Sequence, residues 1–387
     1  MPDRIYLDWN ATTPLRPEAR AAMTAALDIV GNPSSVHAEG RQARRLMEDA
    51  RAAVAQAVGA VPRNVVFTSG GTEANALALN PGVRAPAGPV ERLLVSAIEH
   101  PSVLAGGQFP RGGLRTVPVT PSGVVDLGQL RRMLADGPPA LVSVMAANNE
   151  TGALQPIYEV GDIVHAAGAL LHVDAIQALG KIPFNINDMG ADLATLSAHK
   201  IGGPKGVGAL ILGPKAEGLA PLLRGGGQER GRRAGTENVI GVSGFGAAAA
   251  AAMAALKADL PRLDCLRDRL EVGLCAAGGA RIFSADVPRL PNTTLFTAPD
   301  LKAETAVIGF DLEGIAVSSG SACSSGKVQA SHVLQAMGVG SGAAQGAVRL
   351  SLGWSTQEAD IDRAVQAWRK LSTTLIKGSD ETVLDRF

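Results

Sequence analysis

Short apolar runs alternate with helical segments along the first half of this chain, and this alternation constrains the fold most. The apolar runs have the length of buried strands, and the segments between them carry apolar residues at helical spacing. Strands that alternate with helices predict a mainly parallel sheet with helices on both faces. The strand candidates are 64–68, 93–97, 141–146 and 169–173, and the helical segments include 126–136 and 156–167. In such sheets ligands bind at the carboxyl ends of the strands.

The length of 387 residues suggests two domains. An Ala-rich helix follows Gly235 and is predicted to end near residue 257, because Pro261 should break it. We therefore expect a large domain over 15–257. A smaller α+β domain is expected to combine 1–14 with 258–387.

Composition narrows the functional class. Lys plus Arg and Asp plus Glu both number 36, which argues against a nucleic-acid or membrane-surface protein. The uncharged stretch 239–256 is mostly alanine and is read as a packed helix rather than a membrane span. Three cysteines without a CxxC pair or an apolar leader suggest the reducing cytoplasm. Cys265 and Cys275, among leucines and alanines, are expected to be buried.

The stretch 191–212 is predicted to be a strand, a glycine-rich turn and a second strand. Lys200 stands at the end of the first strand, among small residues. It could be an amine nucleophile that forms a Schiff base with a carbonyl or with pyridoxal phosphate. A hairpin lysine that points to water is the alternative, and this stretch alone does not decide between them.

Other polar residues also follow predicted strands. Asp174 could pair with a pyridine nitrogen or cap a helix, and Gln177 lies one helical turn later. The turn 68–72 suits a phosphate, although Ser69 or Thr72 could simply cap the following helix. His100 could stack on a flat ring or move protons, or it could be structural.

Three further segments carry candidate ligands. Asn149 lies in an Asn-Asn-Glu-Thr-Gly turn that could be ordinary turn material or could aim amides at a ligand. The loop 225–236 contains a triple glycine, several arginines and Thr236. It could bind an anion, or it could be a solvated loop without a ligand. Arg349 stands inside an apolar strand and needs an anionic partner, either a substrate carboxylate or an internal carboxylate. Cys323, flanked by serines and glycines, is predicted to be an accessible thiol.

These segments together carry a family signature. The chain resembles the pyridoxal-phosphate cysteine desulfurases of the NifS/IscS group, within the class V aminotransferase superfamily. The resemblance runs through nearly the whole chain, in YLDWNATTPLRPEA, NPSSVHAEGRQAR, VVFTSGGTEANALAL, NNETGALQP, HVDAIQALGK, SAHKIGGPKGVGAL, GGGQERGRRAGTENV and VSSGSACSSG. It implies an α/β protein of PLP-dependent transferase fold type I, whose large domain holds a mainly parallel, seven-stranded-type sheet.

The resemblance also implies a role for each residue. Lys200 would form the Schiff base with the cofactor, Asp174 would pair with its ring nitrogen, Gln177 would contact its ring hydroxyl, and His100 would stack on it and help proton transfer. The phosphate and substrate groups would be held by the remaining residues: Gly71, Thr72, Ser197, His199 and Thr236 for the phosphate, Asn149 and Arg349 for the substrate carboxylate, with Asn10 nearby.

The implied reaction takes sulfur from L-cysteine and leaves L-alanine, with a persulfide on Cys323. A homodimer is implied, in which Thr236 reaches the other subunit's site. The sulfur acceptor would be an iron–sulfur scaffold of the NifU/IscU kind, which could share Cys323 as a transient cluster ligand, in nitrogen fixation or in general cluster assembly. The alternatives are another class V enzyme, such as an aminotransferase or selenocysteine lyase, and a non-enzymatic sulfur carrier.

Overall fold

The computed structural model describes residues 4–85, 88–213, 216, 218–320 and 330–376. Its largest element is a seven-stranded sheet in the order β2-β10-β9-β8-β7-β5-β6. Neighbouring strands are parallel, except that β10 runs antiparallel to both β2 and β9. The strands are β2 (Val65–Thr68), β10 (Gly208–Leu212), β9 (Leu193–Ser197), β8 (Leu170–Asp174), β7 (Ala140–Met145), β5 (Arg92–Ser96) and β6 (Leu114–Val117). The expected mainly parallel sheet is confirmed.

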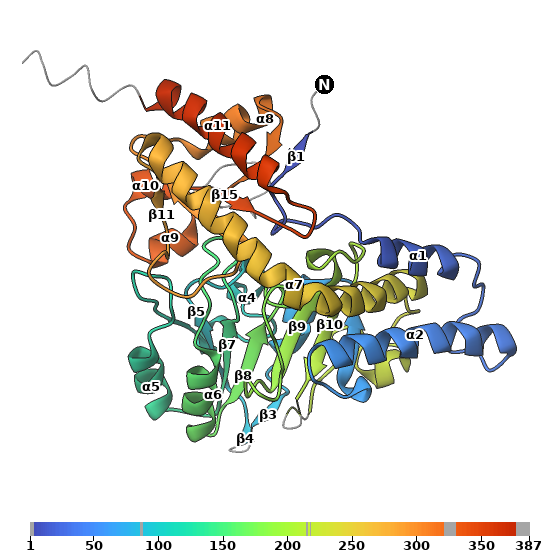
Figure 1. The fold of residues 1–387 in the computed structure, drawn as a ribbon. Helices are drawn as coiled ribbons and strands as arrows, with labels where there is room; N and C mark the ends of the chain where they lie inside the picture. Colours follow the sequence, from blue (N-terminus) through green and yellow to red (C-terminus); the bar gives the residue numbers. More distant parts are fainter. Residues whose placement is uncertain (1–3, 86–87, 214–215, 217, 321–329, 377–387) are drawn as a thin grey trace, which may run out of the picture.

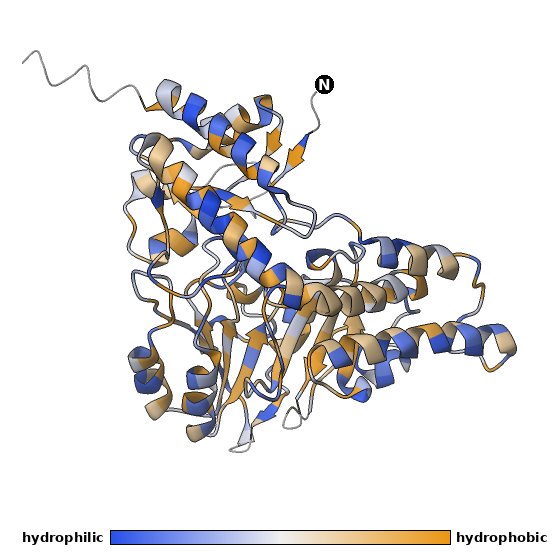
Figure 2. Cartoon of the chain, viewed as in Figure 1, coloured by the Kyte–Doolittle hydropathy of each residue, from blue (hydrophilic) through white to orange (hydrophobic). Residues whose placement is uncertain are grey.

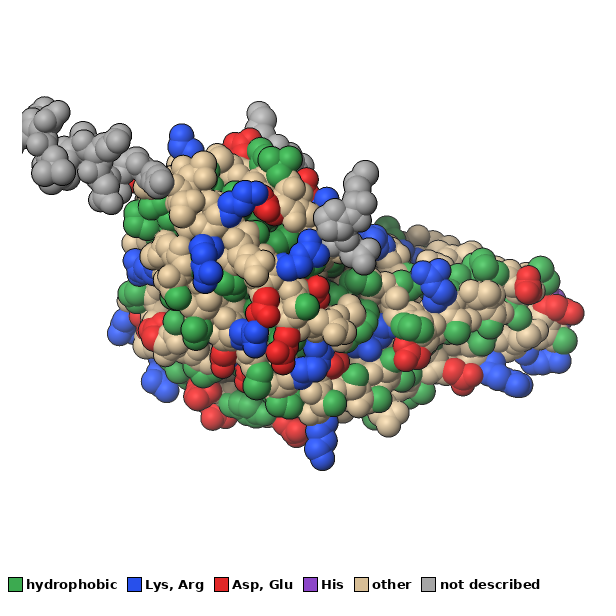
Figure 3. Space-filling model, turned by 45° about the horizontal axis from the view of Figure 1, so that its top comes forward, with side chains coloured by type: hydrophobic (Ala, Val, Ile, Leu, Met, Phe, Trp, Pro, Cys, Tyr) green, Lys and Arg blue, Asp and Glu red, His purple; other side chains and the backbone are tan. Residues whose placement is uncertain are grey.

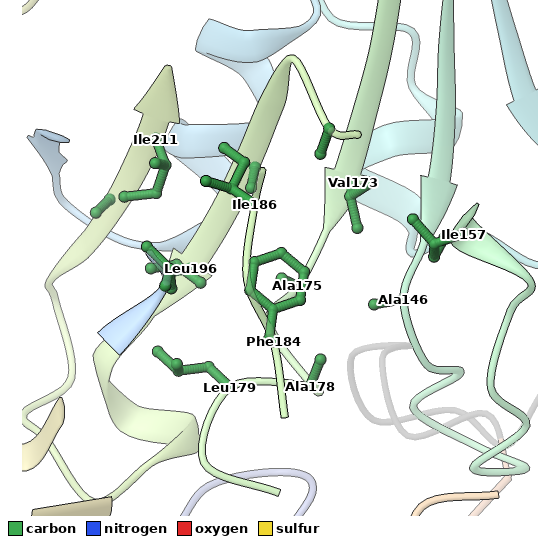
Figure 4. Close-up of a cluster of buried hydrophobic side chains, with 14 of the residues drawn as sticks. Ala146, Ile157, Val173, Ala175, Ala178, Leu179, Phe184, Ile186, Leu196 and Ile211 are labelled. Carbon is green, nitrogen blue, oxygen red and sulfur yellow. The ribbon is translucent and has the colours of Figure 1, made fainter. Parts of the chain in front are cut away.

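Helices cover both faces of this sheet (Figure 1). Successive residues of one strand enter different cores: Leu94 joins the core that contains Val173 and Phe184, whereas Leu93 joins the core that contains Leu77. Figure 4 shows part of the first core, where side chains from several strands converge around Phe184. Burial on both faces explains why these strands are continuous apolar runs. The helices of this part are α1 (Pro17–Ala26), α2 (Ala38–Ala57), α3 (Gly71–Ala78), α4 (Pro101–Leu104), α5 (Leu127–Ala135) and α6 (Ile157–Ala166).

A second sheet has four antiparallel strands in the order β11-β12-β15-β14. Its own core surrounds Trp368, which packs edge-on against Phe296. The N-terminal strand β1 pairs in parallel with β13, so the start of the chain joins this part. The elements are β1 (Ile5–Tyr6), β11 (Arg281–Ile282), β12 (Thr293–Thr297), β13 (Ile315–Ala316), β14 (Ser318–Ser319), β15 (Val348–Ser351), α8 (Ala303–Leu312), α9 (His332–Ala336), α10 (Ser341–Gln345) and α11 (Glu358–Leu375); a small hairpin, β3 (Arg84–Ala85) and β4 (Gly88–Pro89), lies elsewhere. An α+β unit beside the large sheet is confirmed, while the domain boundaries stay a prediction.

The prediction that Pro261 ends the Ala-rich helix is wrong. One helix, α7 (Val239–Gly278), continues through Pro261, and Figure 1 shows that it changes direction along its length. Proline removes one backbone hydrogen bond and bends a helix, but packing can hold both arms. Val242 lies in the core of the large sheet and Leu270 in the core of the small one, while Pro261 itself is exposed, so water can reach the carbonyl that loses its partner.

Helix α7 also corrects the prediction for two cysteines. Cys265 and Cys275 are exposed, because the buried stripe of this arm is formed by other residues, Leu263, Leu266, Leu270 and Leu274. The helix has an 18-residue window apolar enough to cross a membrane. It packs against α1, α2 and α11, as a core helix does. Figure 2 shows its apolar segment over the large sheet, and Figure 3 shows charges of both signs interspersed over one face of the molecule.

Candidate active site

One cavity of about 260 Å³ lies at the carboxyl ends of the large sheet's strands. It collects side chains that are far apart in the sequence, because each follows a different strand. Eleven of the predicted residues line it: Asn10, Gly71, Thr72, His100, Asn149, Asp174, Gln177, Ser197, His199, Lys200 and Arg349. Thr236 lies instead on a neighbouring cavity with Ser69 and Gly206. Cys323 lies outside the described residues.

Lys200 occupies the last position of a short 3-10 helix, Ala198–Lys200, directly after β9. Its Nζ donates to the backbone carbonyls of Asn10 at 2.6 Å and Ala11 at 2.8 Å. The predicted strand–turn–strand unit is confirmed, since β9 and β10 pair antiparallel. Because Lys200 lines the cavity, the alternative of a hairpin lysine that points to water is wrong.

The glycines of this hairpin allow close approach between backbone segments. A Cβ at Gly208 would stand 2.5 Å from the backbone carbon of Gly70. Gly202 has φ +88°, and a side chain there would collide with Arg16 and Trp354. Only glycine adopts a positive φ without strain and leaves room for such close contacts. The hairpin that carries Lys200 therefore packs closely against the turn that precedes α3.

Asp174 is the last residue of β8 and is buried. Its Oδ2 accepts from Nδ2 of Asn75 at 2.9 Å, and its Oδ1 accepts from the backbone N–H of Ile176 at 3.0 Å. Burial raises the pKa of this carboxyl, although these hydrogen bonds and the nearby His100 and Lys200 oppose the shift. A buried carboxylate of this kind is stabilised by a cationic partner in the cavity.

The first turn of α3 faces the same cavity through Gly71 and Thr72. The N-cap is Gly70, and no side chain caps this helix, so the predicted alternative of a Ser69 or Thr72 cap is wrong. A Cβ at Gly71 would stand 2.4 Å from Cδ1 of Ile176, so the helix start lies close to the β8 end. Open N–H groups at a helix start attract an anion.

Arg349 enters the cavity from β15 and is 2 % exposed. Its Nη2 pairs with Oδ1 of Asp8 at 2.7 Å, and its Nη1 donates to the carbonyl of Asn149 at 2.9 Å. The internal ion pair considered from the sequence therefore exists. Nε of Arg349 is buried without a hydrogen-bond partner in the described chain, which leaves one donor for an anionic ligand.

Asn10 joins the two sheets beneath this cavity. Its carbonyl accepts from Lys200 and from Nε2 of Gln177, the latter at 3.0 Å. Its Oδ1 accepts from Nζ of Lys181 at 3.0 Å, and its Nδ2 donates to Thr293 at 2.8 Å. Lys181 was missed from the sequence, although it lies four residues after Gln177 and also contacts it.

Other buried polar residues near the cavity were missed as well. Asn75 and Ser102 carried no sequence signal, because their partners come from other elements. Glu99 and Glu150 are buried, and burial raises the pKa of Glu150 to about 7 against the opposing hydroxyl of Ser331. Within the described part of the chain, no group of three or more His, Cys, Asp or Glu side chains could hold a metal ion.

Comparison with known proteins identifies the family. The aminotransferase class-V family model matches residues 5–364. A cysteine desulfurase of Cereibacter sphaeroides is 44% identical over 372 residues, covering 94% of each chain. Cysteine desulfurase IscS of Dictyoglomus turgidum is 38% identical, covering 96% of this chain and 95% of that one. The crystal structure of a NifS-like protein from Rickettsia africae superposes with a TM-score of 0.87 at 38% identity, covering 96% and 99% of the two chains. The chain belongs to the class-V aminotransferase family, in its NifS-like cysteine desulfurase group, which is generally PLP-dependent.

Proposed function

We propose that this chain is a pyridoxal-phosphate-dependent cysteine desulfurase that converts L-cysteine into L-alanine and a persulfide on Cys323. The observation that carries the proposal is the single cavity that brings Lys200, Asp174, His100 and Arg349 together from separate strands. Membership of the family supports the substrate and the reaction type.

The residues present fit the cofactor. The uncapped start of α3 at Gly71 and Thr72, with Ser197 and His199 on the same wall, would hold its phosphate. Lys200 would hold it covalently through Nζ, Gln177 would bind its ring hydroxyl, and the buried carboxylate of Asp174 would lie against its ring nitrogen. When bound, pyridoxal phosphate supplies an electron sink for charge that develops at the substrate's α-carbon.

The substrate carboxylate would bind at Arg349. The buried Nε supplies an unused donor, and Asp8 and Asn149 fix the guanidinium from its other side. A planar guanidinium held in this way suits a carboxylate. Asn149 and Asn10 line the same wall, so they would set the orientation of the amino acid.

Cys323 would accept the sulfur. Its thiolate attacks the substrate sulfur, the C–S bond breaks, and an S–S bond forms. The electron pair of the C–S bond stays on carbon, which takes a proton and becomes the methyl group of alanine. One cysteine and one enzyme thiol thus yield one alanine and one enzyme persulfide, so atoms and electrons balance.

A homodimer completes the proposal. Thr236 is exposed and lies outside the main cavity of its own chain, which supports a role at the partner's phosphate site. The α1–α2 end projects from the body (Figure 1), and it exposes the apolar residues Leu27, Val30 and Val36, which a partner subunit could cover.

The sulfur acceptor would be an iron–sulfur scaffold of the NifU/IscU kind in the cytoplasm. Cys323 would serve it as a transient cluster ligand, in nitrogen fixation or in general cluster assembly.

The test is to incubate the purified protein, loaded with pyridoxal phosphate, with L-cysteine. We expect alanine in solution and a persulfide mapped by mass spectrometry to Cys323. Cys323→Ala should abolish sulfur release, whereas Cys265→Ser and Cys275→Ser, which replace exposed thiols on α7, should not. Full sulfur release by Cys323→Ala with bound cofactor would contradict the proposal, and Lys200→Ala should abolish the cofactor's visible absorbance.

A further inference from the structure

A chain of buried polar side chains runs from His100 beneath the cavity. We call it the His100 network: it comprises His100, Ser102, Asn75, Asp174, Thr195, His172 and Ser143. His172 and Ser143 are fully buried, and Asn75 and Thr195 are also inaccessible to solvent. Hydrogen bonds in such a place have directions that depend on one another, because every buried polar atom needs a partner.

The backbone fixes the first direction. His100 is the N-cap of α4, and its Nδ1 accepts from the backbone N–H of Ser102 at 3.2 Å. A backbone N–H can only donate, so Nδ1 carries no proton. The hydroxyl oxygen of Ser102 also lies 2.8 Å from this nitrogen. The proton of a neutral His100 ring is therefore on Nε2.

Asn75 fixes the second direction. Its Nδ2 lies 2.9 Å from Oδ2 of Asp174 and 2.9 Å from Oγ of Ser102. The amide nitrogen must face the carboxylate, since the amide oxygen would be repelled there. Ser102 thus accepts from Asn75 and donates its own hydrogen to Nδ1 of His100.

The rest of the network agrees with this orientation. Oδ1 of Asn75 accepts from the hydroxyl of Thr195 at 2.6 Å. Thr195 then accepts from Nε2–H of His172 at 3.2 Å, and Nδ1 of His172 accepts from Ser143 at 2.8 Å. Every donor and acceptor has a consistent role, and Nδ2 of Asn75, which donates to both Ser102 and Asp174, lies at the branch point.

We infer that His100 acts as a neutral hydrogen-bond donor through Nε2–H and is not a proton acceptor in the resting enzyme, with Ser102 and Asn75 as the positioning residues that impose this state. A second proton would have to enter at Nδ1, where two donors already point. The inference deepens the proposed function, on which it rests, and it differs from the proton-transfer role expected for His100 from the family resemblance.

Burial of His100 acts in the same direction. Burial lowers the pKa of His100, and the nearby Lys200 and His332 lower it further, while Asp174 opposes them. A neutral imidazole at a helix start can still polarise a bound group by donating its N–H. Proton transfer at the substrate's α-carbon would then fall to another group that lines the cavity.

Nitrogen-15 NMR of the histidine-labelled protein, with and without pyridoxal phosphate, tests the inference directly. The chain has six histidines, so loss of one signal in His100→Gln assigns its ring. We expect a proton on Nε2 and none on Nδ1 at neutral pH, for His100 and for the internal reference His172. A proton on Nδ1 of His100, or a doubly protonated ring, would overturn the inference. A proton on Nδ1 of His172 would overturn the assigned direction of the Asn75 amide.

Two sets of variants provide further measurements. Ser102→Ala removes one donor to Nδ1 and should raise the pKa of His100, a change that lost packing alone would not produce. Glutamine can place an N–H where Nε2 stands and asparagine cannot, so His100→Gln should keep about tenfold more kcat than His100→Asn. Equal losses in both would support proton transfer instead. A failed tautomer assignment leaves persulfide formation on Cys323 unaffected, so the two proposals fail separately.

Discussion

The buried ion pair between Arg51 and Glu229 should dominate the stability of the loop that carries Thr236. Glu229 accepts from Arg51 through both oxygens, at 2.7 and 2.8 Å, and from the backbone N–H of Phe67 at 3.0 Å. The two side chains are only 8% and 2% exposed. Removing one partner of such a pair leaves a buried charge and costs about 3–5 kcal/mol.

Glu229→Gln is the informative change, because it keeps the shape and one acceptor but removes the charge. We expect the free energy of unfolding to fall by about 3 kcal/mol, the lower end of that range. The matched control is Asp362→Asn, since Arg269 and Asp362 form a similar two-oxygen pair with both side chains 49% exposed. An exposed pair is screened by solvent and contributes little to stability, so this control should unfold like the parent protein.

Urea unfolding of the cofactor-free protein, followed by circular dichroism, measures both variants. A second, local readout comes from the backbone: Glu229 and Arg230 have φ of 47° and 57°, a left-handed conformation that costs non-glycine residues about 1–2 kcal/mol each. Without the ion pair this turn should open, and trypsin should cleave after Arg230 faster than in the control. Equal losses of stability in Glu229→Gln and Asp362→Asn would refute the reasoning.

Two further predictions concern residues near the cavity. Burial raises the pKa of Glu150 to about 7, above its ordinary value of 4.5. Between these two pH values the folded state retains a proton that the unfolded chain loses, so the free energy of unfolding should fall as pH rises from 4.5 to about 7. Glu150→Gln should flatten that slope in urea titrations between pH 4.5 and 7.5, and an unchanged slope would show that other groups cause it. Gly208→Ala would drive a Cβ to 2.5 Å from the Gly70 backbone and should weaken pyridoxal phosphate binding at least tenfold by fluorescence titration, whereas Gly340→Ala, which meets nothing within 4 Å, should bind normally.

Much of the large sheet could be predicted because its strands are buried on both faces. Continuous apolar runs such as β7 and β8 give a strong signal, and the polar residue after each run then marks the ligand edge. The half-exposed edge strand β6 gave no such run and was missed. Pro261 predicted a helix end, but α7 continues through it because each of its arms packs into a hydrophobic core.

Site residues whose type is unusual in the local sequence could be predicted one by one. Contacts between residues that are far apart in the sequence could not be predicted. Lys200, Asp174 and Arg349 are unusual for their local surroundings, so each attracted attention alone. Asp8 and Arg349 are 341 residues apart, and their ion pair exists only through the pairing of β1, β13 and the second sheet. Asn75 and Ser102 are ordinary polar residues until the fold places them between His100 and Asp174.

The placement of Asn10 and Arg349 has a further consequence for how this site is assembled. Lys200 and Asp174 belong to the large sheet, but the carbonyl that receives Lys200 and the guanidinium proposed for the substrate come from chain segments attached to the small sheet. Asn10 also donates to Thr293 of β12, so a shift between the sheets would move both groups together. Because a misplacement of about 1 Å is enough to slow an enzyme strongly, the contact between the two sheets has to be as rigid as either core. The continuous helix α7, anchored in both cores across Pro261, is the element that connects the two cores directly.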